Sequence, residues 1–266
     1  MAAGQAIGEE RVSDSLVIRK CNGVEEFQQC VEVQKEVWNF SDLDVVPLRM
    51  FVVADKIGGQ IIGTFDGNHM VGFALSIPGS RNGHPYLHSH MLAVRESHRN
   101  AGLGRRMKLA QREDGLARGF DLIEWTFDPL EIKNAYLNIE KLGAIARRYT
   151  INQYGMSSSP LQGGLPTDRL IAEWWIRSRR VATLVNSGEL PQYKTTSSVE
   201  VPAAIYAWKA SLTDRKKAAD VQLRNREALL KAFDADLAVV RYERDAAGNG
   251  KFLLGHWDED WSYASQ

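Results

Sequence analysis

The residues best suited to chemistry lie between Tyr86 and Gly119, where an apolar strand leads through a glycine-containing loop into a basic helix. The loop covers residues 95–104 and the helix residues 105–118. The first amide groups of a helix have no partner within the helix, and the helix dipole is positive at that end. Glycine lets an anion approach the backbone closely because it has no Cβ. This stretch therefore predicts an anion site suited to a pyrophosphate, with added positive charge from Arg99, Arg105 and Arg106.

The spacing of the loop residues separates it from other nucleotide-binding loops. A G-x-G-x-x-G dinucleotide fingerprint fails because Met107 occupies its third glycine position, and a G-x-x-x-x-G-K-[ST] loop is absent. What remains is Arg99-x-x-Gly102-x-Gly104, which follows a strand that ends at Val94. This pattern resembles the acyl-CoA pyrophosphate loop of the GNAT superfamily of N-acyltransferases, in which Gln or Arg is followed by two residues, Gly, one residue, and Gly or Ala.

The resemblance implies which residues hold acetyl-CoA or another acyl-CoA as the co-substrate. Backbone N–H groups of the strand before the loop polarise the thioester carbonyl, here those of Leu92, Ala93 and Val94. The loop and the helix start bind the pyrophosphate, here through Arg99, Asn100, Ala101, Gly102, Leu103, Gly104 and Arg105. Asn134 and Asn138 are expected to contact the pantetheine arm, which lies where the central strand splays from the strand at residues 123–127.

Two side chains are candidates for the base that takes the proton of the acceptor amine. Strand alternation puts Glu124 on the same face as Thr126 and Asp128, near the splay, although a structurally paired carboxylate is the alternative. His90 shares a face of the central strand with His88, and the alternative is two satisfied core histidines.

The acid that protonates the leaving thiolate is harder to assign. In the family a tyrosine stands four residues before the glycine that ends the fourth helix, and counting back from Gly143 gives Ile139. Tyr136 is the nearest substitute, with Asn138 as a second, and both have structural alternatives as packed or surface side chains. The histidines His84, His88 and His90 lack a clean set of further ligands, so we predict no metal site.

Hydrophobic periodicity predicts the elements that position these residues. The expected order β-α-α-β-β-β-α-β-α-β-β over residues 16–180 matches the GNAT fold, an α/β (α+β) arrangement with a mixed, mostly antiparallel central sheet flanked by helices. The two helices at residues 24–38 and 47–57 line the acceptor pocket in that family, whereas the residues alone indicate amphipathic core helices. Residues 78–85 are predicted to form a turn-rich loop.

The expected organisation has three parts. Residues 1–15 form a flexible N-terminal arm, residues 16–180 the acyl-CoA-binding domain, and residues 181–266 a C-terminal extension. The extension begins with a loop-like stretch at 180–198 and continues as a charged helix at 214–234 and a hairpin of strands 237–242 and 251–254. A helix and two strands bury little surface alone, so we expect the extension to pack on the domain or on a second copy in a homodimer.

Composition excludes several classes of protein. The 33 basic and 33 acidic residues cancel, so no overall field attracts nucleic acid or an anionic membrane. No apolar run approaches the ~20 residues of a membrane span, and the first fifteen residues lack the layout of a secretory signal. Cys21 and Cys30 are expected to be free thiols, which together with these features predicts a cytoplasmic protein.

The function that follows is an acyl-CoA-dependent N-acyltransferase. It is expected to move an acetyl or succinyl group to the amine of a small molecule or amino acid by direct attack on the thioester. Residues 125–130, 134–135 and 138–143 resemble a predicted GNAT subgroup that carries a C-terminal extension, and this resemblance suggests N-succinyl transfer to amino acids as one assignment. A GNAT-like domain that binds acyl-CoA as a sensor or scaffold without turnover is the alternative, and acetylation of protein lysines is a third reading.

Overall fold

The computed structural model describes residues 10–11, 15–40, 42, 44–155 and 162–263, and its chain forms two compact units. The first unit runs to Glu124 and includes Ser262 and Tyr263 from the end of the chain, and the second runs from Trp125 to Trp261. Strand β6 (Leu122–Phe127) begins in the first unit and ends in the second. The predicted boundaries at residues 15 and 180 stay a prediction.

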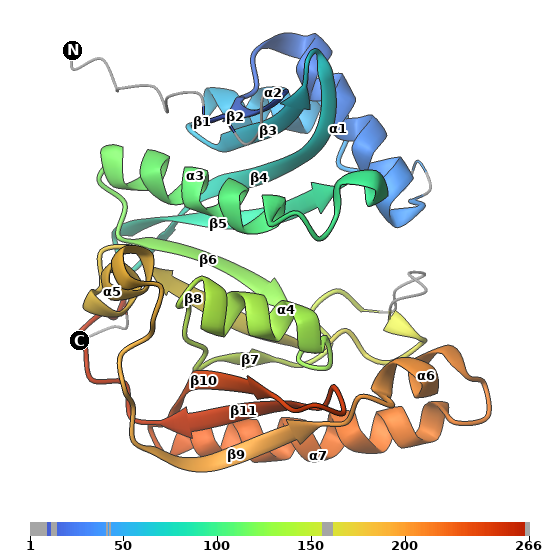
Figure 1. Cartoon of the computed structure of the whole chain (residues 1–266), viewed down its shortest axis with the longest axis vertical. Helices are drawn as coiled ribbons and strands as arrows, with labels where there is room; N and C mark the ends of the chain where they lie inside the picture. The colour runs from blue at the N-terminus through green and yellow to red at the C-terminus, as the bar shows by residue number, and fades with distance from the viewer. Residues whose placement is uncertain (1–9, 12–14, 41, 43, 156–161, 264–266) are drawn as a thin grey trace. The chain divides into compact units, whose positions relative to one another are not determined.

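The first unit is built on a mostly antiparallel sheet (Figure 1). Neighbouring strands pair in chain order, and they are β1 (Glu10–Arg11), β2 (Leu16–Lys20), β3 (Gln60–Asp66), β4 (His69–Arg81) and β5 (His84–Val94). The start of β6 then pairs parallel to β5, with Leu87 opposite Ile123 and His88 opposite Glu124. Strands β1 to β5 thus pair antiparallel, and β6 enters the sheet in the same direction as β5.

Helices cover both faces of this sheet. On one face α1 (Gly23–Trp38) and α2 (Leu48–Lys56) pack through residues such as Phe27 and Phe51 against Phe73 of β4. On the other face α3 (Leu103–Ala117) packs through Met107 and Ala110 against Ile62 and Ala74. The 3-10 turn η1 (Glu96–His98) precedes α3 in the chain. The apolar residues of α1 recur at helical spacing, so their burial against the sheet explains why this segment is helical.

A β-bulge in β5 changes which side chains face each layer. The register moves from Leu75 opposite Met91 to Ser76 opposite Ser89, which leaves His90 as the extra residue. As a result Met91 and Ala93 pack with the α1–α2 layer, while Leu92 packs with the α3 layer. Simple alternation along the sequence does not give this switch of faces.

The second unit contains the rest of the secondary structure. Its helical elements are α4 (Ile132–Tyr136), the π turn η2 (Leu137–Lys141), α5 (Arg179–Ser187), α6 (Ile205–Ala210) and α7 (Arg215–Asp234). Its strands, beside the end of β6, are β7 (Tyr149–Thr150), β8 (Arg169–Trp175), β9 (Thr195–Val201), β10 (Ala238–Arg244) and β11 (Gly250–Gly255). The order β10-β11-β9 forms an antiparallel sheet, and α7 runs along it (Figure 1).

Buried Arg180 joins three segments of the second unit. Its guanidinium donates to the carbonyl oxygens of Gly143 at 2.8 Å and Val240 at 2.7 Å. Burial lowers the pKa of Arg180, and the neighbouring Tyr193 partly offsets this effect. The residue thus fixes the end of η2 and strand β10 to α5 through charge-assisted hydrogen bonds.

The predicted fold class is confirmed, since helices flank a mostly antiparallel sheet and a C-terminal helix and hairpin are present. Two predicted loops were wrong. Residues 78–85 are mostly strand, because β4 and β5 form a long hairpin that turns only at Asn82 and Gly83. Residues 180–198 contain most of α5 and the start of β9. Of the predicted arm, the structure describes residues 10, 11 and 15, and no described helix is long and apolar enough to cross a bilayer.

Asp114 fixes α3 to the sheet from the buried side of the helix. Its carboxylate accepts from Gln60 Nε2 at 2.7 Å and Arg118 Nη1 at 2.9 Å, and it forms an ion pair with Lys20. Burial alone would raise the pKa of Asp114, but the hydrogen bonds from these three partners outweigh it and lower the pKa below 3.8. The ionised carboxylate therefore stabilises the folded state.

Replacing Asp114 by Asn is expected to lower the free energy of unfolding by about 2 kcal/mol, because the charge-assisted bonds to Lys20 and Arg118 are lost. Asp114 binds a proton less readily in the folded state, so its contribution is present above pH 3.8 and is lost as the pH falls through the lower folded value. Denaturant unfolding at pH 7 and pH 3 measures both effects. Asp55→Asn, an exposed change on α2, is the control. If the two variants had equal free energies of unfolding at pH 7, Asp114 would not stabilise the attachment of α3 to the sheet.

Candidate functional site

The N-terminal end of α3 lies open toward the loop that precedes it. Gly102 is the N-cap residue, with φ 75° and ψ 4°, and no side chain caps the helix. The first intrahelical bond runs from Arg106 N to Gly102 O at 3.1 Å, so the amides of Leu103 and Gly104 point out of the helix end. A positive φ is strained for residues other than glycine, which explains why the turn has glycine at this position.

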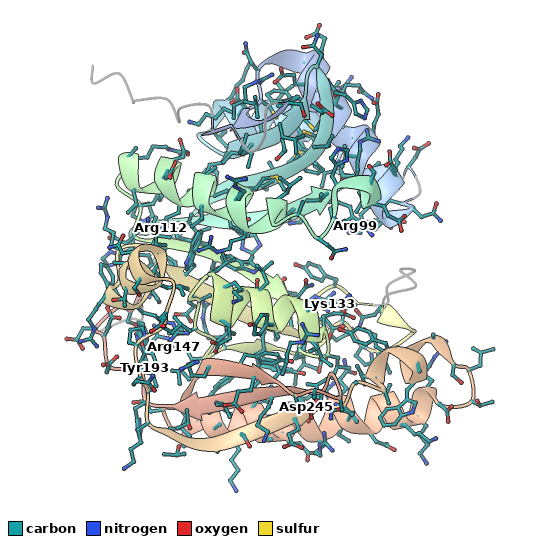
Figure 2. The ribbon with its side chains drawn as sticks, in the orientation of Figure 1. Arg99, Arg112, Lys133, Arg147, Tyr193 and Asp245 are labelled. Atoms are coloured by element: carbon teal, nitrogen blue, oxygen red, sulfur yellow. The ribbon has the colours of Figure 1, made fainter. Side chains whose placement is uncertain are left out.

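The space in front of this turn is open. A Cβ built at Gly102 meets no heavy atom within 4 Å, and one at Gly104 meets only Leu92, at 3.5 Å. Arg99 is exposed beside the turn, and its Nε donates to Val94 O at 3.1 Å, which ties the loop to the end of β5 (Figure 2). The donors present at this turn are backbone amides and guanidinium groups, the chemistry that a pyrophosphate requires.

The remaining predicted loop residues surround the turn. Asn100 has φ 65° and is exposed, as is Ala101, whereas Leu103 is buried and Arg105 half-buried. The buried side chain of Leu103 therefore fixes the start of α3 to the core, while the backbone amide of Leu103 remains at the open end of the helix. The predicted residues 99–105 thus cover the end of the loop and the first three residues of α3.

The outer edge of β5 beyond His88 has no strand partner among the described residues, because its pairing with β6 stops at Glu124. Arg95 N donates to Val71 O at 2.8 Å. Because amides alternate in direction along a strand, the amide of Ala93 also points toward β4. The amides of Leu92 and Val94 consequently face the open edge. The sequence analysis assigned the amides of Leu92, Ala93 and Val94 to the same role. The hydrogen-bond pattern shows that the amide of Ala93 points toward β4 instead.

Glu124 lies inside a network of charged groups. It is buried, and both carboxylate oxygens accept from Arg81 Nη2, at 2.8 and 2.9 Å. His88 Nδ1 lies 3.8 Å from the same carboxylate. A carboxylate held in this way is already compensated, so its role as a positioning group fits the geometry better than that of a proton acceptor.

His90 is exposed next to this network, at the β-bulge. The His88 and His90 ring centroids lie 6.3 Å apart. The pKa of His90 is lowered below 6.5, first because the fold partly removes the ring from water and second because of His88. His90 is therefore neutral near pH 7 and able to accept a proton, with its ring accessible to solvent.

Sequence reasoning missed a polar network beneath the sheet. Lys108 is 4% exposed, and its Nζ donates to Ser89 Oγ at 2.8 Å. Gln111 accepts from Ser89 Oγ at 3.1 Å and donates to Ser76 Oγ at 2.6 Å. Burial lowers the pKa of Lys108. The spacing of three residues between Lys108 and Gln111, which puts both on one helix face, was the signal available in the sequence.

Three predicted site residues belong to the second unit. Asn134 is exposed and Asn138 buried, while Tyr136 is half-buried with its ring 5.2 Å from Lys141 Nζ. Ile139, at the position of the family's tyrosine, is completely buried. Their participation with the first-unit residues in one site stays a prediction.

The three histidines considered for zinc are not grouped as ligands. His84 stacks on Tyr263 with ring centroids 4.7 Å apart. Within the described ranges, no group of three or more His, Cys, Asp or Glu side chains is arranged to hold a metal ion. Cys21 and Cys30 are buried free thiols, as predicted.

Comparison with known proteins gives a consistent result. Residues 23–136 match the model of the acetyltransferase (GNAT) family. No curated protein matches the chain. Among solved structures, the ribosomal-protein-S18-alanine N-acetyltransferase from Escherichia coli is 14% identical with a TM-score of 0.50, and the match covers 61% of this chain and 95% of that one. This similarity concerns the fold.

Two further structures have lower scores. An aminoglycoside 6'-acetyltransferase type Ii is 20% identical with a TM-score of 0.49, over 61% of this chain and 98% of that chain. An acetyltransferase from Salmonella typhimurium, solved with its cofactor acetyl-CoA, is 15% identical with a TM-score of 0.49, over 62% of this chain and 96% of that one.

Gly102→Ala is expected to separate anion binding from folding. The added methyl enters open space, so it costs only the positive-φ strain, about 1 kcal/mol. The same methyl obstructs the approach of a phosphate to the amides, and the Kd for CoA should rise at least about tenfold by calorimetry. Gly67→Ala, also at positive φ with no atom within 4 Å, is the matched control. Unchanged CoA affinity in Gly102→Ala would count against the turn as the anion site.

Proposed function

Residues 23–136 form an acetyltransferase domain of the GNAT family, and from this premise we propose that the chain transfers an acetyl group from coenzyme A to the amine of a small molecule or amino acid. The family match confirms the predicted family and enzyme class. The observation that supports the proposal further is the uncapped start of α3, which follows in the chain the edge of β5 that has no strand partner among the described residues. Both features leave backbone amides free for a ligand on one continuous stretch of chain.

The amide groups of this stretch have two proposed roles. Those of Leu103 and Gly104, with Arg99, bind the pyrophosphate of the acyl-CoA. Those of Leu92 and Val94 donate to the thioester oxygen, where negative charge develops as the amine attacks. Acyl-CoA itself supplies an activated acyl group as a thioester. These backbone donors are held by the β4–β5 ladder and by α3, so they need little reorganisation during the reaction.

We assign the proton acceptor to His90 rather than Glu124. His90 is neutral near pH 7 because its pKa is lowered, and its ring is accessible. Glu124, in contact with Arg81 and close to His88, holds the neighbouring histidine in place. Tyr136 and Asn138 remain proposals for the thiolate and pantetheine contacts, and succinyl in place of acetyl remains a second proposal for the acyl group.

The activity is tested by following free CoA thiol when acetyl-CoA or succinyl-CoA is mixed with a panel of amino acids, polyamines and aminoglycosides. Thiol release that requires both an amine and the intact Gly102 turn supports the enzyme. Tight CoA binding with no release on any amine would instead identify a sensor or scaffold. An amine-dependent product of the expected mass provides the direct confirmation.

His90→Gln is expected to lower kcat/KM by about 100-fold or more at pH 7.5, because a positioned general base commonly contributes that much. In the native enzyme, protonation of His90 should produce an acid limb in the pH profile below 6.5, and this limb should disappear in the variant. The KM for acetyl-CoA should change little.

His69→Gln, an exposed histidine at the start of β4, is the control for that experiment. A His90→Gln enzyme that keeps both its rate and its acid limb would remove His90 from the mechanism. Glu124→Gln would then be the next variant to measure.

A further inference from the structure

A row of polar residues crosses the sheet of the first unit beneath α3. Gln60 of β3 lies opposite Ser76 of β4, and Ser76 lies opposite Ser89 of β5. All three side chains are buried. Their neighbours on this face of the sheet, such as Ile62 and Ala74, are apolar. Buried hydroxyl and amide groups in such a layer need hydrogen-bond partners, and the helix above the sheet supplies them.

Gln111 of α3 is the residue that binds all three members of this row. It is completely buried, and its Nε2 donates to Ser76 Oγ at 2.6 Å while its Oε1 accepts from Ser89 Oγ at 3.1 Å. Its main-chain oxygen accepts from Gln60 Nε2 at 2.9 Å. A single residue of the helix therefore joins three strands, and its side-chain amide forms a bridge between β4 and β5.

Lys108, one helical turn before Gln111, sets the direction of this bridge. Its Nζ donates to Ser89 Oγ at 2.8 Å. Because the Ser89 oxygen already accepts from Lys108, the Ser89 proton is directed to Gln111 Oε1. The amide nitrogen of Gln111 is then the donor for Ser76. The bonds thus run in one direction, from Lys108 through Ser89 and Gln111 to Ser76.

The bridged pair of serines borders the β-bulge. Ser76 lies opposite Ser89, whereas on the other side of the bulge Leu75 lies opposite Met91, so the pairing leaves out His90. Leu75 and Met91 pack with the α1–α2 layer, and both serines bind the helix on the other face. The Gln111 bridge is therefore located at the step where the register of the two strands changes.

Moving the bulge by one residue would change the position of His90. If Ser89 were the extra residue, Ser76 would lie opposite His90, and the imidazole would share the face of Ser76 beneath α3. The pairs on both sides of the bulge would stay unchanged, so local interactions must decide between the two arrangements. The bridge distinguishes them, because the hydroxyl of Ser89 reaches Gln111 only when Ser89 is the partner of Ser76.

We propose that Gln111 is a positioning residue for the acetyl transfer: its side chain holds Ser89 opposite Ser76, and this keeps His90 at the bulge with its ring exposed. The inference rests on the proposed function for the role of His90 as the proton acceptor. Gln111 is completely buried, so it acts through the backbone of β5 and not by contact with the substrates. A fixed position matters because misplacement of a reacting group by about 1 Å can lower a rate by about 100-fold.

Gln111→Met is the first test, because methionine has a similar length and helix propensity but makes neither bond of the bridge. Amide hydrogen exchange in peptides covering residues 88–91, measured by mass spectrometry, should become at least about tenfold faster, since the bulge is no longer held. Gln34→Met is the matched control. Gln34 is equally buried and binds main-chain atoms of Cys30 and Val46, and its substitution should leave exchange at residues 88–91 unchanged.

Kinetics separate positioning from a general loss of structure. At pH 7.5, Gln111→Met should lower kcat/KM at least about tenfold, with little change in the KM for acetyl-CoA. In the His90→Gln background the same substitution should lower kcat/KM by less than about twofold, because the group that it positions is already absent. An equal loss in both backgrounds would overturn the positioning role.

Ser76→Ala keeps the test informative if Gln111→Met is poorly folded. It removes one end of the bridge without changing α3, and exchange at residues 88–91 should become at least about threefold faster. Unchanged exchange in both variants would overturn the positioning role and leave the proposed function intact. Faster exchange in a protein that releases no CoA with any amine would instead contradict the proposed function, and with it the role of Gln111 in transfer.

Discussion

The structure of the first unit depends on how α3 is held. A helix that starts without a side-chain cap leaves amide donors at its end, and these serve a ligand only if the helix is fixed against the sheet. Asp114 provides this fixation on the buried side, through Gln60 of β3 and Lys20 of β2. Met107 and Ala110 add apolar packing on the same side. The ionic anchor and the turn that we propose as the anion site thus lie on one helix, and Asp114 is near its C-terminal end while the free amides are at its N-terminal end.

The β-bulge at His90 links this helix to the proposed reaction centre. Because His90 is the extra residue, Leu92 faces the α3 layer while Met91 and Ala93 face the opposite layer. The strand edge beyond His88 is left without a partner in the described structure, and His90 itself reaches solvent beside Glu124 and Arg81. The inserted residue thus lies where the pairing of β5 with β6 ends in the described structure, and its neutral histidine is exposed there.

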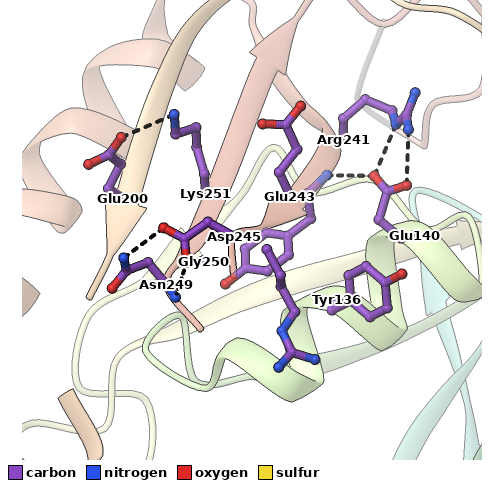
Figure 3. A pocket seen from close by; sticks show the side chains of 11 residues that line it. Tyr136, Glu140, Glu200, Arg241, Glu243, Asp245, Asn249, Gly250 and Lys251 are labelled. Carbon is purple, nitrogen blue, oxygen red and sulfur yellow. Dashed lines mark hydrogen bonds and ion pairs between the residues drawn. The ribbon is translucent and has the colours of Figure 1, made fainter. Parts of the chain in front are cut away.

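The second unit uses charge differently. Its buried Arg180 binds main-chain carbonyl oxygens, and charge pairs join Arg241 of β10 to Glu140 and Lys251 of the central strand β11 to Glu200 of β9 (Figure 3). Several buried polar groups of this unit have no hydrogen-bond partner within the described structure, among them Arg180 Nη1 and the hydroxyls of Tyr193 and Tyr242.

The sequence by itself determined the Arg99-x-x-Gly102-x-Gly104 turn, the order of most elements, and the fold class, because local spacing and hydrophobic periodicity encode these features. It did not reveal that Lys108 is buried, that residues 78–81 extend β4, or that Ala93 turns its amide inward. Those properties depend on strand register, and one bulge shifts register in a way that no local pattern records. The pairing of Glu124 with Arg81, far apart in sequence, likewise needed the tertiary structure, because contacts between distant residues are set by which strands become neighbours.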